Sequence, residues 1–173
     1  MGILSRLNTD LKTFIRTKRG KVIFIGFCLI VFYYLGVAPH LTVAVTGSLR
    51  YKLFWTDLAP DVSKISKGSY VRFELHHPLL VNPVTHMAIK EVVCAGGDSL
   101  RVDDHKQYFC NEQALGAAKD KALTGALLKH FVFNGVVPQD ALFVMGHHKD
   151  SLDSRYVGFV NRSMVKQIAY PLY

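Results

Sequence analysis

Two residues in this sequence have the types needed for acyl-transfer chemistry without a histidine. Ser48 lies in the short segment 46–49 (Thr-Gly-Ser-Leu), and Lys90 ends the apolar run 86–90 (His-Met-Ala-Ile-Lys). A serine hydroxyl attacks a carbonyl only when a neighbouring base removes its proton, and a neutral lysine amine is able to act as that base. The pair therefore indicates a serine nucleophile with a lysine general base.

Lys90 must lose its proton near neutral pH to serve as a base. The ordinary lysine pKa of about 10.4 has to fall to roughly 7–8, which burial and the absence of a paired carboxylate achieve. Apolar residues flank this part of the chain, and Glu91 would point to the opposite face of a strand. Without the other segments, an ordinary exposed strand lysine is the simpler interpretation.

A glycine beside a nucleophile allows backbone N–H groups to converge on one point. The Ser48 amide and the Thr46 hydroxyl would then hold an oxyanion, which is the usual way to stabilise the transition state of acyl transfer. A Gly-Ser pair is also common in turns, so this motif carries little weight alone. A third segment, 146–156 (GHHKDSLDSRY), completes the candidate set.

An apolar run precedes the Ser48 segment. Residues 22–39 contain no charged side chain, and a membrane-spanning helix needs about 17–25 apolar residues. The run is longer and bulkier than the core of a cleaved signal peptide, and no Ala-x-Ala sequence follows it. It also lacks the polar stripe of a buried core helix. We therefore expect a retained transmembrane anchor over residues 22–39.

Basic residues concentrate before that run. The net charge of the chain is +8, and residues 1–21 contribute +5 of it through six Lys or Arg and one Asp. A basic end can bind nucleic acid, but its position beside an apolar run favours a role in membrane topology, because positive residues stay in the cytoplasm. Residues 1–21 are then a cytoplasmic tail, residues 40–173 lie outside the cytoplasm, and no nucleic-acid partner is expected.

Residues 40–173 are long enough for one domain and have the patterns of a mainly β fold. Period-2 alternation and β-branched runs predict strands, including a hairpin over 99–102 and 107–110. The other expected strands are 43–45, 51–56, 69–75, 87–95, 141–145 and 164–170. Two prolines make 76–83 a loop, and 111–121 is expected to be a loop or one helical turn.

Cys94 and Cys110 would face an oxidising compartment, where disulfides persist. A bridge between them would close a loop of about 15 residues and stabilise the fold by roughly 3 kcal/mol in the chain-entropy model. Two buried free thiols are the alternative, and the spacing leaves both open. The eight histidines form no His-Glu-x-x-His motif, so we expect neither a metal site nor any other cofactor.

Together the three segments resemble those of the S26 signal peptidases, the type I leader peptidase family with a Ser/Lys dyad. Residues 46–49 are similar to its Ser-Gly-Ser-Met-like box, and residues 90–98 to its Lys-Arg-Val-x-Gly-x-Pro-Gly-Asp-like box. Residues 146–158 are similar to its third box, of which Ser-x-Asp-Ser-Arg-Tyr is the most specific part. The resemblance implies a catalytic domain with the S26/S24-type β-fold, carried on one N-terminal transmembrane helix.

The resemblance also implies roles for the matching residues. Ser48 would be the nucleophile and Lys90 the general base. Thr46 would be the side-chain donor to the oxyanion, and Ser151 would hydrogen-bond and orient the lysine.

Other matching residues would support the site or meet the substrate. Asp153 and Arg155 would form a structural ion pair. The family's cleft accepts small residues before the cut and takes the substrate as an added strand. The residues at the matching cleft positions are Ala44, Leu49, Ala88 and Ile89.

The sequence departs from the family pattern at several positions. Leu49 stands in place of the usual Met, Tyr51 and Gly96 in place of Pro, and His147-His148 in place of Asp-Asn. The chain is short, has one anchor, and has no room for the large extra β-domain of housekeeping leader peptidases. These features resemble the TraF-type peptidases of conjugation systems, which mature pilin subunits and in some plasmids join the pilin ends into a ring.

The resemblance thus implies a serine endopeptidase anchored in the bacterial inner membrane, with its catalytic domain in the periplasm. Its partners would be the lipid bilayer and a membrane-inserted precursor, either a pilin or a secreted preprotein. The apolar segment 79–81 is a candidate for bilayer contact. One alternative is a small general type I signal peptidase, and another is an inactive scaffold relative in pilus assembly. A self-cleaving repressor-like module is disfavoured by the anchor and by the lack of a DNA-binding region.

Overall fold

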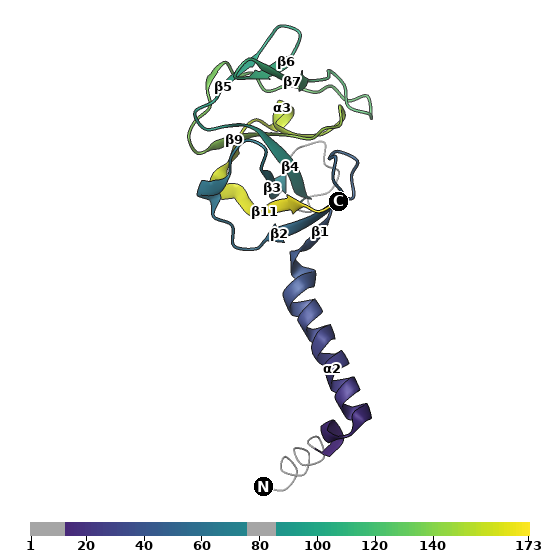
Figure 1. Ribbon diagram of the computed structural model, residues 1–173. Coiled ribbons are helices and arrows are strands. Elements are labelled where there is room, and N and C mark those ends of the chain that lie inside the picture. The colour runs from purple at the N-terminus through teal and green to yellow at the C-terminus, as the bar shows by residue number, and fades with distance from the viewer. Residues whose placement is uncertain (1–12, 76–85) are drawn as a thin grey trace, which may run out of the picture. The chain divides into compact units, whose positions relative to one another are not determined.

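A computed structural model describes residues 13–75 and 86–173 (Figure 1). The chain divides after Leu41 into an N-terminal helical unit and a C-terminal unit of strands, Thr42–Tyr173. The loop expected at 76–83, with its apolar segment 79–81, lies outside the described residues.

The described part of the N-terminal unit contains a continuous helical segment over residues 18–40. Helix α2 spans Lys18–Phe32, and a π-helical turn, Tyr33–Val37, and a 3-10 turn, Ala38–His40, continue it. Thr17 caps its start, because the Thr17 hydroxyl accepts a hydrogen bond from the Gly20 backbone N–H at 2.9 Å.

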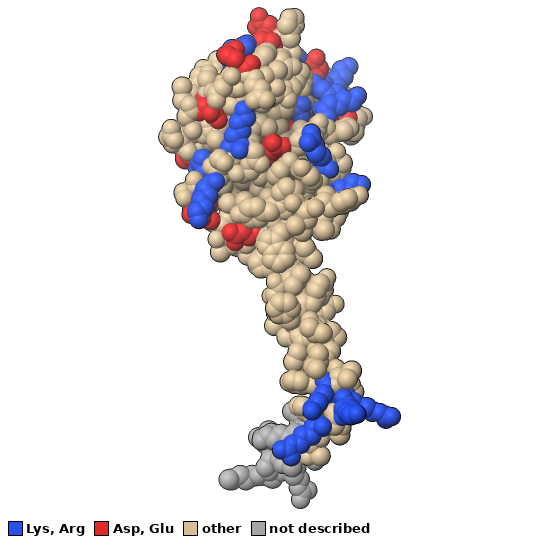
Figure 2. All heavy atoms as spheres, viewed as in Figure 1, with Lys and Arg blue, Asp and Glu red and all other residues tan. Residues whose placement is uncertain are grey.

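This segment has the length and composition of a membrane-spanning helix. Lys18–His40 is 23 residues long, with a mean hydropathy of 2.3 over its most apolar window, and none of that window is buried. At 1.5 Å per residue it is about 35 Å long, enough for a hydrocarbon layer of about 30 Å. Basic side chains gather at the start of α2 (Figure 2). The helical segment begins at Lys18 and ends at His40, so it is longer at both ends than the expected 22–39.

Among the described residues, eleven strands form two sheets. The larger sheet has the order β1-β2-β11-β3-β4-β9-β10, and the smaller has the order β7-β6-β5-β8. The strands of the larger sheet are β1 (Leu41–Val43), β2 (Leu53–Asp57), β3 (Tyr70–Leu75), β4 (His86–Ala95), β9 (Ala141–Met145), β10 (Val160–Asn161) and β11 (Val165–Pro171). Those of the smaller sheet are β5 (Ser99–Val102), β6 (Gln107–Cys110), β7 (Gln113–Ala117) and β8 (Gly135–Val136). Short helical turns at Val62–Lys64, Ser154–Val157 (α3) and Arg162–Met164 join them.

Two hydrophobic clusters lie on opposite faces of the larger sheet. One contains Val71, Phe73 and Val92, and the other contains Tyr108 and Phe143 beneath the smaller sheet. The mainly β fold expected from the sequence is therefore confirmed. Only the second cluster contains residues of both sheets, so it is the one that packs the two sheets together.

The register of β4 changes at Val93, and this change links the two clusters. The pairing with β9 shifts between Val92 and Cys94, which marks a β-bulge. Val92 faces the first cluster, whereas Val93 and Cys94 both contact the second. Strict alternation would have returned Cys94 to the face of Val92. The bulge thus turns Cys94 toward the smaller sheet.

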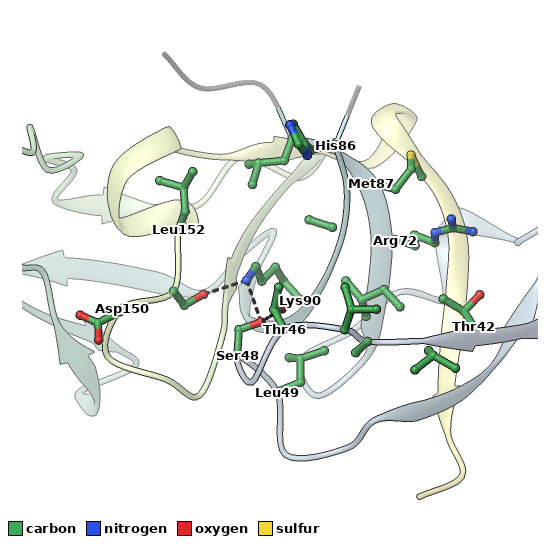
Figure 3. A pocket seen from close by; sticks show the side chains of 17 residues that line it. Thr42, Thr46, Ser48, Leu49, Arg72, His86, Met87, Lys90, Asp150 and Leu152 are labelled. Atoms are coloured by element: carbon green, nitrogen blue, oxygen red, sulfur yellow. Dashed lines mark hydrogen bonds between the residues drawn. The ribbon is translucent and has the colours of Figure 1, made fainter. Parts of the chain in front are cut away.

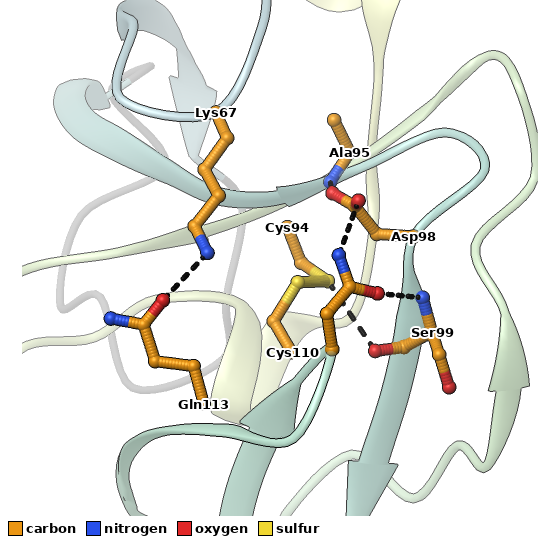
Figure 4. Close-up of a disulfide and its surroundings, with 8 residues drawn as sticks. Lys67, Cys94, Ala95, Asp98, Ser99, Cys110 and Gln113 are labelled. Carbon is orange, nitrogen blue, oxygen red and sulfur yellow. Dashed lines mark hydrogen bonds between the residues drawn. A yellow bond between two sulfur atoms is a disulfide. The ribbon is translucent and has the colours of Figure 1, made fainter.

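The structure contains a disulfide between Cys94 on β4 and Cys110 on β6 (Figure 4). The bond crosses from the larger sheet to the smaller one, and both cysteines are fully buried. Among the described residues, the one grouping with metal-ligand geometry is Cys94, Asp98 and Cys110. Its two sulfur atoms are joined to each other, so this group does not form a metal-ligand set.

The expectation of a loop or helical turn over 111–121 was wrong for residues 113–117. Residues Gln113–Ala117 form β7 and pair with β6. Asn111 and Glu112 make the intervening turn with φ of 47° and 63°, the left-handed geometry of a tight hairpin. The segment Gln-Ala-Leu-Gly-Ala has no β-branched residue, so strand propensity gave no signal. The predicted hairpin 99–110 is confirmed as β5 and β6.

Candidate active site

Ser48 lies in a turn between β1 and β2. The Ala44 N–H donates to the Lys52 carbonyl at 2.8 Å and closes the base of this turn. The Leu49 side chain is buried against Phe54 and Tyr70, which fixes the chain just after the serine. Because Leu is similar in volume to the usual Met, it can fill this position.

The third segment holds the same turn from the other side. The Ser48 carbonyl oxygen accepts hydrogen bonds from the backbone N–H groups of His147 at 2.7 Å and His148 at 3.3 Å. These contacts use the main chain, so replacing Asp-Asn with His-His does not remove them. Gly146 lets the segments approach, since a Cβ there would lie 2.3 Å from Ser151 Oγ and 2.9 Å from the Ser48 carbonyl oxygen.

Lys90 reaches the turn from β4. Its side chain is buried, with the residue only 5 % exposed, and it stands opposite Val71 of β3. Lys90 Nζ lies 2.8 Å from Ser151 Oγ and 3.4 Å from Ser48 Oγ (Figure 3). Thr46 Oγ1 is 2.9 Å from Ser48 Oγ. The structure thus brings together the four residues for which the family resemblance implies catalytic roles.

Burial lowers the pKa of the Lys90 amine, because the charged form loses its hydration. The Asp153 carboxylate raises this pKa and the Arg155 guanidinium lowers it, both to a smaller extent than burial. The arrangement therefore favours an uncharged amine beside Ser48.

Asp153 and Arg155 form a buried ion pair behind the lysine. Arg155 donates from Nε and Nη2 to the two Asp153 carboxylate oxygens at 2.9 and 2.8 Å, a bidentate geometry. Asp153 also accepts from the Gly146 N–H at 3.0 Å. The carboxylate that raises the Lys90 pKa is thus paired with Arg155, and it also anchors the turn that carries Ser151.

Glu91, the residue after Lys90, points away from it. The Glu91 carboxylate accepts a hydrogen bond from the Tyr70 hydroxyl at 3.2 Å and lies 3.0 Å from His147 Nε2. His148 instead lies beside Asp150, with Nδ1 3.6 Å from its carboxylate. The two adjacent histidines therefore have different carboxylate neighbours.

Ser48 and Lys90 open onto a groove of about 390 Å³. It runs between the chain around 42–49 and the first half of β4, and residues 150–152 border it. The four predicted cleft residues, Ala44, Leu49, Ala88 and Ile89, all line it. Strand β9 pairs with β4 only from Glu91 onward. Within the described chain, β4 therefore has an edge without a ladder partner before Lys90, and an extended peptide can pair with such an edge.

Several residues that line the groove had no role in the sequence-based interpretation, namely Thr42, Arg72, Leu75, His86, Met87 and Leu152. The available signal was their position on strands near Lys90, but which strand face meets the 42–49 segment depends on how that segment crosses the sheet. The structure also explains why residue 96 is glycine and not the usual proline. A Cβ at this position would lie 2.6 Å from the Gln139 backbone.

A buried lysine beside a serine hydroxyl in such a groove is an arrangement that a serine peptidase can use. The sequence profile of the family described as signal peptidase, peptidase S26, matches residues 16–170. The chain therefore belongs to the S26 signal peptidase family, whose members are serine peptidases that cleave signal peptides from preproteins. This confirms the family-level resemblance.

A crystal structure of a signal peptidase I from Enterococcus faecalis V583 is also similar to this chain. The identity is 21 %, the similarity covers 61 % of this chain and 96 % of that chain, and the TM-score is 0.38. No curated protein sequence matches the chain.

Proposed function

We propose that this protein is a membrane-anchored serine endopeptidase in which Ser48 is the nucleophile and Lys90 the general base. The observation that carries this proposal is the position of the Lys90 amine, buried between the hydroxyls of Ser48 and Ser151. A lysine there is close enough to exchange a proton with the serine, and its lowered pKa leaves it able to accept one.

The reaction begins with a precursor lying as an extended strand along the free edge of β4. Neutral Lys90 takes the proton of Ser48, and Ser48 Oγ attacks the carbonyl carbon of the small residue before the cut. The negative oxygen of the tetrahedral intermediate accepts hydrogen bonds from the Ser48 N–H and the Thr46 hydroxyl. Lys90, now protonated, donates to the departing amine as the C–N bond breaks.

The acyl-enzyme ester is resolved in a second step. Lys90 accepts a proton from a water molecule, whose oxygen attacks the ester carbonyl. The C–O bond to Ser48 then breaks, Lys90 returns the proton to Ser48 Oγ, and the released peptide carries the new carboxyl group. A peptide amine that attacked instead would form an amide bond and join two chain ends. Ser151 keeps the lysine oriented in both steps through the 2.8 Å contact.

In the proposed topology, residues 1–21 are cytoplasmic, residues 22–39 span the bacterial inner membrane and residues 40–173 are the periplasmic peptidase domain. The basic residues at the start of Lys18–His40 and the uncharged residues 22–39 that follow them support this orientation. The one apolar helix of the described residues and the Ser-Leu sequence at the nucleophile favour the TraF-type role. The proposed substrate is therefore a conjugative pilin or another transfer-system precursor.

Co-expression with the pilin precursor encoded nearest this gene tests this role. Wild type should cut the precursor, and Ser48→Ala and Lys90→Ala should leave it intact. The product mass separates hydrolysis from ring closure by the mass of one water. Cleavage of secreted preproteins in general, with the pilin precursor left intact, would instead support a small general signal peptidase.

A further inference from the structure

The groove beside Ser48 contains a second basic side chain that the cleavage mechanism does not use. Arg72 on β3 is one of the residues that line it. Figure 3 shows Arg72 between Met87 and Thr42, away from the Ser48 turn and on the side opposite Asp150. In cross-strand register Arg72 stands opposite Ile89, the residue before Lys90.

Strand pairing holds the Arg72 head group in place. Gln167 of β11 stands directly opposite Arg72 on the other side of β3. Arg72 Nη1 donates to Gln167 Oε1 at 2.6 Å, and the residue is half-buried. An amide partner fixes the guanidinium without neutralising it, and the guanidinium keeps further N–H donors for a ligand.

The acidic side chains in this part of the sheet and groove have other partners. Glu91, on the same face as Arg72 and opposite Tyr70, accepts a hydrogen bond from the Tyr70 hydroxyl and lies 3.0 Å from His147 Nε2. Glu74, two residues further along β3, has Lys166 Nζ within 3.9 Å. Asp150 is the acidic residue among those lining the groove in the described part of the chain, and it is paired with Lys119. Among the described residues, the Arg72 guanidinium therefore has an amide and no carboxylate as its hydrogen-bond partner.

We propose that Arg72 binds an acidic side chain of the precursor on the N-terminal side of the cut. This inference rests on the proposed function and narrows the substrate class to precursors with Asp or Glu shortly before the small residue at the cleavage point. A guanidinium binds a carboxylate through two parallel hydrogen bonds, a geometry that an amide or a lysine does not reproduce. Ala88 and Ile89, proposed to meet the residues before the cut, lie on the adjacent strand.

Binding to the full-length Ser48→Ala variant in detergent tests the inference apart from catalysis. The probes are short fluorescent peptides with alanine at the cut, in pairs that carry Glu or Gln at each of the second to fifth residues before it. At one position the Glu peptide should bind about 5- to 20-fold more tightly, and added salt should reduce this preference.

Variants at Arg72 assign the preference to its side chain. In the Ser48→Ala background, Arg72→Gln should bring the Glu-to-Gln affinity ratio close to one, and Arg72→Glu should prefer a Lys peptide at the same position. The matched control is Arg101→Gln, a half-buried strand arginine that lies over the Phe109 ring outside the groove. This control should keep the Glu preference.

Each outcome separates this inference from the proposed function. Equal affinities at every position, or a Glu preference that survives Arg72→Gln, would overturn the role of Arg72 while Ser48-dependent cleavage by wild type stands. A Glu preference lost with Arg72→Gln would support the inference, even if wild type cleaved none of the peptides and the proposed function failed. Peptides that neither bind nor are cut would contradict both.

Discussion

The proton on Lys90 controls the proposed chemistry at the level of single residues. Burial lowers the pKa of this amine, and the ion pair of Asp153 with Arg155 reduces the opposing effect of the carboxylate. Only the neutral amine can accept the Ser48 proton. Activity should therefore rise as pH increases through the lowered pKa of Lys90 and fall as pH drops below it.

The first prediction concerns the Lys90→Met variant, which keeps the length of the side chain and removes the base. We expect kcat/KM to fall about 100- to 10,000-fold, with the rising limb of the pH profile lost. Steady-state cleavage measured over a range of pH checks this. A Lys90→Met enzyme with a wild-type pH profile would contradict the role of Lys90.

The same pKa makes a separate prediction for stability. The folded-state pKa of Lys90 is below its unfolded value of about 10.4, so between the two the unfolded chain binds more protons. The Lys90 contribution to the free energy of unfolding therefore rises with pH across that window. Denaturant unfolding at several pH values should show this dependence in wild type and its loss in Lys90→Met.

At the level of secondary-structure elements, the site depends on how closely the turn after β9 approaches the Ser48 turn. A methyl group at Gly146 would meet Ser151 Cβ at 2.8 Å as well as the Ser48 carbonyl. Gly146→Ala should therefore separate the two turns, destabilise the protein by about 1–3 kcal/mol and abolish cleavage. Thermal unfolding together with an activity assay measures both effects.

Gly47→Ala is the matched control for stability. A Cβ at Gly47 has no atom within 4 Å, so its melting temperature should match that of wild type. If Gly146→Ala melted with wild type and retained activity, the close approach of the turns would not be essential.

Local sequence was sufficient to predict the residues and strands that lie in a recognisable motif or an alternating apolar pattern. Ser48, Lys90 and Ser151 were predicted because each lies in a motif segment. Strand β7 was missed because its residues have low strand propensity, and it forms because the Asn111-Glu112 turn returns the chain along β6. The bulge at Val93 and the position of Arg72 in the groove arise from pairing between distant strands. No local pattern encodes these features.

At the level of the whole molecule, the Cys94–Cys110 bond joins the two sheets. It crosses the cluster that contains Tyr108 and Phe143 and links residues separated by 16 positions. We predict that the Cys94→Ala, Cys110→Ala double variant loses about 3 kcal/mol of stability. Chemical unfolding of both proteins in detergent checks this value.

Reductant provides an independent control for the disulfide. It should lower the melting temperature of wild type and leave that of the double variant unchanged, whereas Cys28→Ser, at the exposed free cysteine, should behave as wild type does. A double variant as stable as wild type would show that hydrophobic packing alone holds the sheets together.

The most direct test of the central claim is the intact mass of a preprotein after incubation with purified full-length protein in detergent. The control variant is Lys67→Met, which changes an exposed lysine that donates a hydrogen bond to Gln113. Wild type and this variant should each cut the preprotein once, after a small residue. Ser48→Ala and Lys90→Met should leave the preprotein at its full mass. The same product formed by either of these two variants would contradict the assignment of Ser48 and Lys90 as nucleophile and base.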